Sequence, residues 1–274
     1  MFYAILAAAI VLTAFLMFSG FNYRNLSDEI RRLYSQSKNI SGKTFSYKQL
    51  SGLPEPVKKY FRHVLKEGQP YISYVNLTHN GLFKTGKNND WIKMSGEEYF
   101  TAEKPGFIWQ GKTAMFTATD KYMNGQGNLK VVLLSVYNIL NEKGEHYDQG
   151  ELLRWLGESV WFPTNLLPNE HLQWSALDKN SAKLDFNYRG IKVSYNVLFN
   201  SAAEIVQLEA QRYMGPDKLE TWVGKMSDYK MLNNVLIPTA VEASWKLKNG
   251  EFSYARFTIE EIDYQKSSLV NETL

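Results

Sequence analysis

The chain has 274 residues, 31 of them basic and 28 acidic, and a formal net charge of +3. The charges are spread along the chain, which excludes the concentrated positive surface of a DNA- or RNA-binding protein, so no nucleic-acid partner is expected. The absence of cysteine excludes disulfides, thiol nucleophiles and cysteine-ligated zinc.

An apolar segment opens the chain. Residues 1–18 carry no charge, and the apolar run extends to residue 21. At about 1.5 Å per residue, a helix of this length matches the ~30 Å thickness of a bilayer core. A cleaved signal peptide is the alternative, but no lysine or arginine precedes the run and no small-x-small cleavage site follows it. We therefore expect a single-pass transmembrane anchor over residues 1–21, with the membrane as a partner.

Residues 22–52 are expected to connect this anchor to the folded domain. The apolar residues Leu26, Ile30, Leu33 and Tyr34 recur at helical spacing, which predicts a short juxtamembrane helix. Residues 35–52 are rich in serine, glycine, lysine and asparagine without sustained periodicity, which is typical of a linker.

The folded domain is expected over residues 53–265, with a tail at 266–274. It opens with a proline-initiated helix of about ten residues, whose apolar positions repeat at i, i+3, i+4, i+7 and i+8 from Val57 to Leu65. Its opposite face is basic. That face either meets anionic headgroups or, as the favoured alternative, is solvated.

From residue 72 the pattern changes to period two, which predicts strands. The first set covers 73–83, 91–100, 106–110, 114–123 and 129–137; the second covers 172–177, 182–188, 191–199, 205–213, 220–231, 236–248 and 251–264. Apolar residues within 148–167 suit a helix that ends before Pro163. Short connections favour antiparallel neighbours. The fold class is therefore mainly β (α+β), a curved antiparallel sheet or half-barrel of about 11–12 strands with a helical insertion.

The insertion carries the most suggestive polar group. Steps of three and seven residues nearly complete whole helical turns, so Glu151, Arg154 and Glu158 share one face. Two carboxylates beside an arginine suit acid–base chemistry or a polar headgroup. The favoured alternative is an ion-pair ladder on the surface or on the roof of the sheet.

Other catalytic and metal signatures are missing from the sequence. The four histidines, at positions 63, 79, 146 and 171, stand at no metal-ligand spacing, so no metal is expected. No G-x-S-x-G, P-loop or G-x-G-x-x-G element occurs, and no cofactor is expected.

Large aromatic rings are the second unusual feature. Rings on strands and on the inserted helix suit the lining of an apolar pocket, although they suit a thick β core equally well. The candidate lining residues are Trp109, Trp155, Trp161, Phe162 and Trp174, with Glu151, Arg154 and Glu158 as polar contacts near the mouth.

Several short motifs, in this order, resemble an uncharacterised bacterial family of unknown function, the DUF6544/DUF6920 type. They are the segments at 53–63, 79–83, 105–109, 120–127 and 150–164, followed by Ile237-Pro238 and Trp245. The resemblance covers about residues 53–264 and is most specific at 150–164. It implies no activity.

A looser, architectural likeness is to the LolA-like half-barrel carriers that sort lipoproteins. It implies a concave sheet that holds acyl chains beneath helices, although fold does not imply function. The chain departs from these carriers by its expected anchor and by lacking a lipoprotein cysteine.

The leading functional hypothesis is a membrane-anchored binding protein for a lipid or another apolar ligand. The alternatives are a hydrolase-like enzyme that uses Glu151 or Glu158 with Asp120 or a histidine, and a structural envelope protein. The side of the membrane stays open, because basic residues after the anchor favour the cytoplasm and the carrier likeness favours the opposite side. The sequence indicates no oligomeric state.

Overall fold

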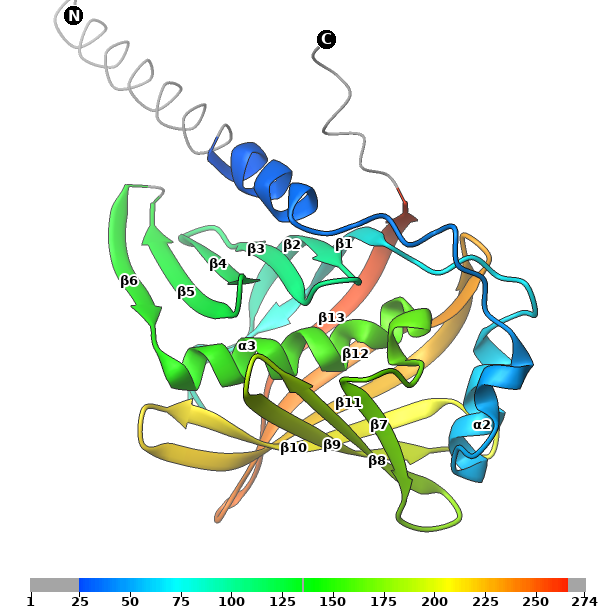
Figure 1. The fold of residues 1–274 in the computed structure, drawn as a ribbon. Coiled ribbons are helices and arrows are strands. Elements are labelled where there is room, and N and C mark those ends of the chain that lie inside the picture. The colour runs from blue at the N-terminus through cyan, green and yellow to red at the C-terminus, as the bar shows by residue number, and fades with distance from the viewer. Residues whose placement is uncertain (1–24, 135, 266–274) are drawn as a thin grey trace, which may run out of the picture.

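The computed structural model describes residues 25–134 and 136–265 (Figure 1). The anchor expected over residues 1–21 and the tail at 266–274 lie outside the described residues. Within the described part of the chain, no helix is both long enough and apolar enough to span a bilayer.

In the described part of the chain, one antiparallel sheet of 13 strands forms the body of the molecule, in the spatial order β6-β5-β4-β3-β2-β1-β13-β12-β11-β10-β9-β8-β7. The strands are β1 Tyr74–Phe83, β2 Ile92–Thr101, β3 Gly106–Lys112, β4 Phe116–Met123, β5 Gln126–Leu133, β6 Tyr137–Lys143, β7 Leu172–Ala176, β8 Ser181–Tyr188, β9 Ile191–Phe199, β10 Ile205–Gly215, β11 Lys218–Leu232, β12 Val235–Leu247 and β13 Gly250–Tyr264. The first strand pairs with the last, so β1 and β13 lie side by side in the middle of the sheet. The predicted mainly β class is thereby confirmed.

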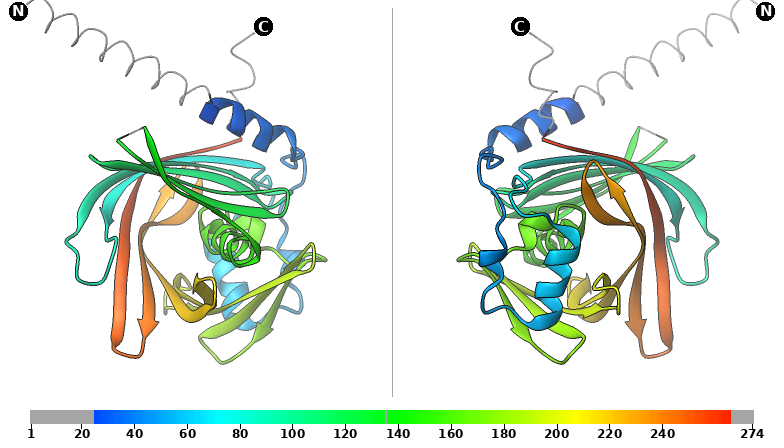
Figure 2. Two further views of the ribbon diagram at one scale, coloured as in Figure 1. Left: turned by 90° about the vertical axis from the view of Figure 1, so that its left-hand side faces the viewer. Right: turned by 90° about the vertical axis from the view of Figure 1, so that its right-hand side faces the viewer.

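The sheet curls around a helical insertion (Figures 1 and 2). The insertion consists of α3, Glu145–Glu158, and two short 3-10 helices, η2 Ser159–Trp161 and η3 Pro163–Leu166. Leu152 and Leu156 of α3 are fully buried against the sheet. Gly157 permits the close approach, because a Cβ atom there would lie 2.7 Å from the Tyr195 hydroxyl of β9.

Strand β6 is the one strand that the sequence analysis missed. It lies at the sheet edge and pairs only with β5 among the described strands. Nearly all of its residues are exposed, so it lacks the alternation of buried and exposed residues by which a half-buried strand is recognised.

The segment before the domain is packed on it. Residues 25–35 are helical, and Leu26, Ile30, Leu33 and Tyr34 are buried against the outer side of the sheet. Residues 35–52, expected to be a linker, also belong to the folded body. They contain the 3-10 helix η1, Tyr47–Leu50, and their buried side chains Phe45 and Leu50 join the main core. Two isolated apolar residues carry no periodic signal, which is why the sequence suggested a linker.

Helix α2, Glu55–Val64, has the amphipathic pattern predicted for it. Tyr60 packs on Phe199, and Phe61 packs edge-on against Trp174, with ring centroids 5.9 and 6.4 Å apart. α2 therefore fills the space beside β7–β9 with large rings.

Candidate functional site: a cavity between the sheet and helix α3

A cavity of about 560 Å³ lies between the curled sheet and α3. Its walls come from β1–β6, β10–β13, α3 and η2, so segments from across the chain build one site. Most lining side chains are apolar. The larger ones include Phe83, Met94, Trp109, Phe116, Leu129, Val131, Leu140, Trp161, Trp222, Met226 and Phe257. Figure 2 shows α3 inside the curve of the sheet.

The cavity is open because small residues occupy inward positions. The lining includes Ala118 on β4, Gly157 on α3, Gly224 on β11, Ala243 on β12 and Ala255 on β13. A larger side chain at any of the four strand positions would project into the space, whereas a Cβ atom at Gly157 would point toward Tyr195 of β9. The sequence therefore specifies the cavity by small residues on four strands.

Strand glycines also let two indole rings lie flat on the sheet. A Cβ atom at Gly111 would come within 2.3 Å of Cη2 of Trp109, and one at Gly224 within 2.7 Å of Cη2 of Trp222. Each glycine follows its tryptophan by two residues and so shares its face of the strand. The two Trp-x-Gly pairs give the cavity an aromatic wall that takes up little of its depth.

One end of the cavity is charged. The Arg154 guanidinium binds three carboxylates: Oε1 of Glu98 at 3.0 Å, Oδ2 of Asp120 at 2.7 Å and Oε1 of Glu158 at 2.8 Å. It also lies 4.9 Å from the centroid of the Trp109 ring. The ion pairs expected along the helix are therefore part of a buried network that connects α3 to β2 and β4. This network forms part of the cavity wall.

The network holds more carboxyl groups than arginines, and burial raises their pKa. The pKa of Glu98 is raised well above its usual value, first by burial and then by the charge of Glu158. A hydrogen bond between these two carboxyls raises the pKa of Glu98 and lowers that of Glu158, so Glu98 carries the proton. Burial raises the pKa of Asp120 as well, against the pull of Arg154.

A second ion pair lies beside this network. Oε1 of Glu151 is 3.4 Å from the guanidinium of Arg212 on β10. Burial, followed by the charge of Asp120, raises the pKa of Glu151 to about 8 in spite of this arginine. Desolvation outweighs a single contact of that length, so the pKa of the carboxyl stays above its usual value even beside the guanidinium.

His79 lies at the same end of the cavity. Nε1 of Trp109 donates a hydrogen bond of 2.8 Å to its Nε2, which places the imidazole proton on Nδ1. Burial, with the nearby charge of Arg154, lowers the pKa of His79 to about 3. This histidine is thus a neutral, buried N–H donor and not an acid or base at physiological pH.

The polar end keeps unused hydrogen-bonding capacity. Among the described residues, Nδ1 of His79, Oδ1 of Asp120 and Oε2 of Glu158 are buried without a hydrogen-bond partner. Buried polar atoms are nearly always paired, so these atoms are available to hydrogen-bond a further polar group. The arrangement suits the binding of a polar group at the end of an apolar ligand.

Four of the eight candidate site residues line the cavity: Trp109, Trp161, Arg154 and Glu158. The other four lie elsewhere. Nε1 of Trp155 donates to the carbonyl of Thr101, and Phe162 is fully buried against Phe100. Trp174 packs with α2, and Glu151 faces Arg212 behind the cavity wall. The structure therefore divides the predicted aromatic set between lining and core.

Sequence reasoning missed Glu98 and Arg212, yet a signal for both was present. Glu98 lies an even number of residues from the buried Met94 and Phe100, so it is on the same face of β2. Arg212 is on the same face of β10 as the buried Leu208 for the same reason. A charge at an inward position of an alternating strand indicates a buried polar site.

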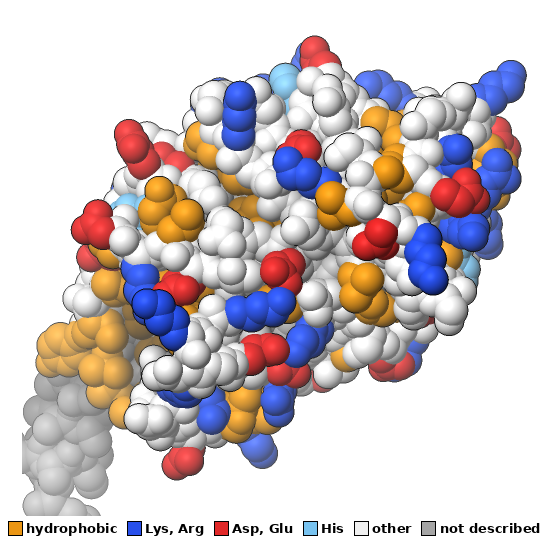
Figure 3. Space-filling view, turned by 90° about the horizontal axis from the view of Figure 1, so that it is seen from below, with side chains coloured by type: hydrophobic (Ala, Val, Ile, Leu, Met, Phe, Trp, Pro, Cys, Tyr) orange, Lys and Arg blue, Asp and Glu red, His pale blue; other side chains and the backbone are white. Residues whose placement is uncertain are grey.

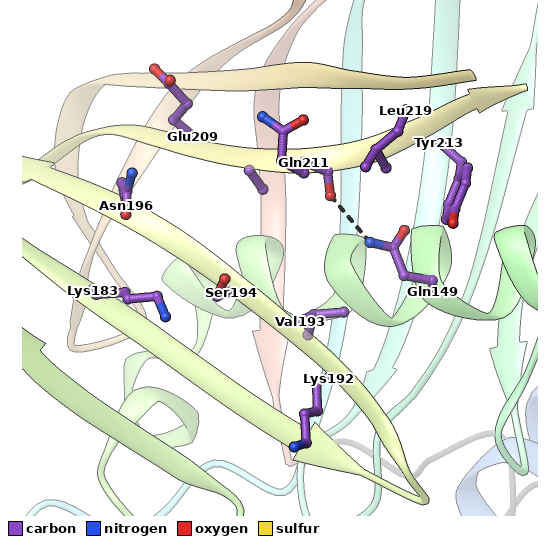
Figure 4. A pocket seen from close by; sticks show the side chains of 11 residues that line it. Gln149, Lys183, Lys192, Val193, Ser194, Asn196, Glu209, Gln211, Tyr213 and Leu219 are labelled. Atoms are coloured by element: carbon purple, nitrogen blue, oxygen red, sulfur yellow. Dashed lines mark hydrogen bonds between the residues drawn. The ribbon is translucent and has the colours of Figure 1, made fainter. Parts of the chain in front are cut away.

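A second, open hollow of about 510 Å³ lies where β9 and β10 separate (Figure 4). The side chain of Gln149 reaches from α3 into this gap and donates to the carbonyl of Gln211 at 3.1 Å. The walls of the hollow carry basic, acidic and amide side chains such as Lys183, Glu209 and Asn196, which do not converge on one point. Across residues 25–134 and 136–265, no three or more histidine, aspartate or glutamate side chains are arranged so that they could hold a metal ion.

Comparison with known proteins gives the family. Residues 43–257 match the profile described as "Family of unknown function (DUF6544)", which covers more than half of the chain, so the protein belongs to this family. The resemblance expected from the motifs is thereby confirmed. No curated protein matches the chain.

The solved structures that are similar to this chain include three with low sequence identity. They are a putative outer membrane lipoprotein-sorting protein domain from Vibrio parahaemolyticus (9% identity, TM-score 0.43, covering 78% of this chain and 92% of that one) and a LolA superfamily protein from Nitrosomonas europaea (11%, 0.42, 76% and 91%). The third is a DUF1329 family protein from Desulfovibrio piger (11%, 0.35, 72% and 87%). Similarity at this level is confined to the fold, and no function is carried over from it.

Proposed function

We propose that this member of the DUF6544 family binds a lipid or another apolar molecule in the cavity between its sheet and α3. One observation carries the proposal: an apolar cavity of about 560 Å³ that ends in a small, buried polar cluster. Ligand sites are typically apolar clefts of about 300–1,000 Å³ with a few convergent polar groups.

The small residues support this proposal, because a sheet gains nothing in stability from them. Protein interiors pack to the density of organic crystals, and a glycine inside a strand weakens that strand. Gly111 and Gly224 nevertheless lie under the two indole rings of the wall, and Ala118, Ala243 and Ala255 leave the middle free. A sequence selected for stability alone would fill this space.

The polar end gives the ligand an orientation. Arg154, His79 and the carboxyls of Asp120 and Glu158 surround the inner end, while the exposed lining residues Thr85 and Ile139 mark the opening. An apolar chain would therefore lie along the aromatic wall with its polar group inward. The expected anchor at residues 1–21 would keep the opening near a source of lipid, and we propose a location at the cell membrane.

Photo-crosslinking of the full chain in vesicles tests this function. The vesicles contain phosphatidylcholine whose acyl chain carries a diazirine, and irradiation is followed by peptide mass spectrometry. We expect crosslinks on peptides that contain Met94, Phe116 or Trp222, at sites facing the cavity.

A matched pair of variants provides the control. Ala118→Trp fills the cavity, whereas Thr119→Trp adds the same side chain to the opposite face of β4. Crosslinks inside the cavity should disappear in Ala118→Trp and persist in Thr119→Trp, and crosslinks on residues 1–21 should persist in both. Crosslinks restricted to the N-terminal segment in the unmodified chain would refute the proposal and favour a structural envelope role.

The hydrolase alternative is favoured by one observation, the hydrogen-bonded carboxyls of Glu98 and Glu158 beside the apolar space, whose mutual contact raises the pKa of Glu98 and lowers that of Glu158. Paired carboxyls with separated pKa values are typical of acid–base catalysis. If the protein is a hydrolase, it should hydrolyse a p-nitrophenyl acyl ester. Glu158→Gln should abolish this activity, while crosslinking inside the cavity persists. Absence of hydrolysis in the unmodified chain would remove this alternative.

A further inference from the structure

Two neighbouring turns carry a cluster of exposed apolar side chains. Met115 lies between β3 and β4, and Leu134, Val136, Tyr137 and Ile139 follow β5; each is 55–64% exposed. We call these five residues the apolar tip. The backbone N–H of Leu134 donates to the carbonyl of Met115 at 2.8 Å, which joins the two turns into one surface.

The backbone at Leu134 points to selection for an apolar side chain at this place. Leu134 has a φ of +48°, in the left-handed region that glycine and asparagine adopt most readily. For other L-residues this conformation costs about 1–2 kcal/mol. Asparagine would remove the strain and improve solubility, yet a 57% exposed leucine occupies the turn.

The apolar tip is continuous with the cavity. Ile139 belongs to both, and two residues that directly follow tip residues, Leu140 after Ile139 and Phe116 after Met115, line the cavity as well. The charged cluster around Arg154 lies at the other end. A molecule passing over the apolar tip would therefore enter the cavity with its apolar part among matching side chains.

The position of the apolar tip relative to the start of the described chain indicates what covers it. The helix at residues 25–35 and the turn between β5 and β6 both lie at the top of the molecule in Figure 1 and in both views of Figure 2. Only three residues lie between residue 21, the end of the apolar segment, and residue 25, so the two are four residue steps apart. Four residues span at most about 14 Å, so a tether in the bilayer would hold this side of the domain at the membrane surface.

The opposite face differs in character. In the view from below, apolar side chains occur in small groups separated by acidic and basic ones (Figure 3). Such a mixed surface is typical of contact with water, whereas a cluster of exposed apolar side chains marks an interaction site.

We propose that the apolar tip docks into the lipid bilayer surface and that ligand passes directly between the bilayer and the cavity at this place. The docking stands on the exposed side chains and their position, and the passage of ligand rests on the proposed function. A bilayer is the favoured occupant because the apolar segment that precedes residue 25 would place one beside the tip.

The absence of cysteine permits a direct test with the full chain. Tyr137→Cys at the apolar tip and Lys179→Cys in the distant turn between β7 and β8 are each labelled with an NBD fluorophore. The proteins are reconstituted into phosphatidylcholine–phosphatidylglycerol vesicles with nitroxide-labelled acyl chains. We expect several-fold stronger quenching at position 137 than at position 179. Equal quenching at the two positions would overturn the proposal.

A combined variant separates docking from ligand binding. Met115→Ser, Leu134→Asn and Tyr137→Ser replace three of the five apolar side chains of the apolar tip, and asparagine suits the backbone at position 134. We expect the rate of crosslinking inside the cavity to fall several-fold, while the final extent of crosslinking stays unchanged. An unchanged rate would overturn the proposed passage even if cavity crosslinks form. Loss of cavity crosslinks in the unmodified chain, with quenching at position 137 intact, would instead refute the proposed function alone.

Discussion

Two regions beneath the same sheet differ in how their space is filled. Beside β7–β9, the rings of Tyr60, Phe61 and Trp174 interlock with Phe199, and their side chains are almost wholly buried. Beside β1–β6 and β11–β13, glycines and alanines leave a cavity of about 560 Å³. We call these the filled region and the cavity region.

The difference shows that aromatic content alone does not distinguish a pocket from a core. Tryptophans occur in both regions, but Trp109 and Trp222 lie flat over glycines, whereas Trp155 and Trp174 each donate to a buried backbone carbonyl within the core. On β3 and β11, the glycine two positions after the tryptophan leaves room for the ring to lie flat along the cavity wall. This distinction leads to predictions that contrast the two regions.

The largest effect is expected from Arg154→Met, which removes the cation from the polar end of the cavity region. Glu98, Asp120 and Glu158 would lose their shared partner while buried. Breaking a buried ion pair in this way costs about 3–5 kcal/mol of the free energy of unfolding. Urea denaturation measures it, with the exposed Arg31→Met as control; a loss below ~1 kcal/mol would show that the network is not structural.

Ring truncation is expected to separate the two regions next. Phe162→Ala, at a fully buried position in contact with Phe100, should lower the free energy of unfolding by about 3–5 kcal/mol. Phe116→Ala should cost about 1–2 kcal/mol, because one side of that ring already faces the cavity and makes fewer contacts. Equal losses in urea denaturation would contradict the contrast between filled and open space.

The pH dependence of stability tests the buried carboxyls. The pKa of Glu151 is about 8 in the folded state and near 4.5 when unfolded, so the folded form binds the proton more tightly. The contribution of this proton to the free energy of unfolding is fully present below about pH 4.5. It is lost as the pH rises to about 8, by at most ~1.4 kcal/mol per pH unit. Glu151→Gln should flatten the profile of unfolding free energy between pH 5 and 8, whereas the exposed Glu145→Gln should leave it unchanged. A profile that rises with pH in this window would contradict the assignment.

The smallest effect is expected at the apolar tip. Its side chains are exposed in the folded protein, so Met115→Ser with Tyr137→Ser should change the free energy of unfolding by less than about 0.5 kcal/mol. The same pair should weaken the nitroxide quenching of a label at position 136. A large stability loss would mean that the apolar tip is covered by protein and not by lipid.

Much of the fold followed from local patterns. Period-two alternation located twelve of the thirteen strands, and the spacing of Leu152, Leu153 and Leu156 located α3. Strand β6 escaped because an exposed edge strand needs no buried face. The packing of Phe45 and Leu50 escaped because it depends on distant partners.

The site was predictable only in part. Helical geometry correctly placed Arg154 and Glu158 on one face, but their partners Glu98 and Asp120 come from strands that only the tertiary fold brings together. The alternation of side chains along each strand does predict that these two acids face inward. It also predicts that Gly224 and Ala118 are small residues at inward positions. Whether such positions meet across a cavity depends on sheet curvature, which no local pattern encodes.

The central claim is that the cavity holds an apolar ligand, and a crystal structure of the full chain purified from membranes in a mild detergent tests it most directly. We predict continuous elongated electron density between the Trp109 and Trp222 rings, with one end at Arg154. Collapse of Trp222, Phe257 and Met226 into that space, with no density between them, would contradict the account.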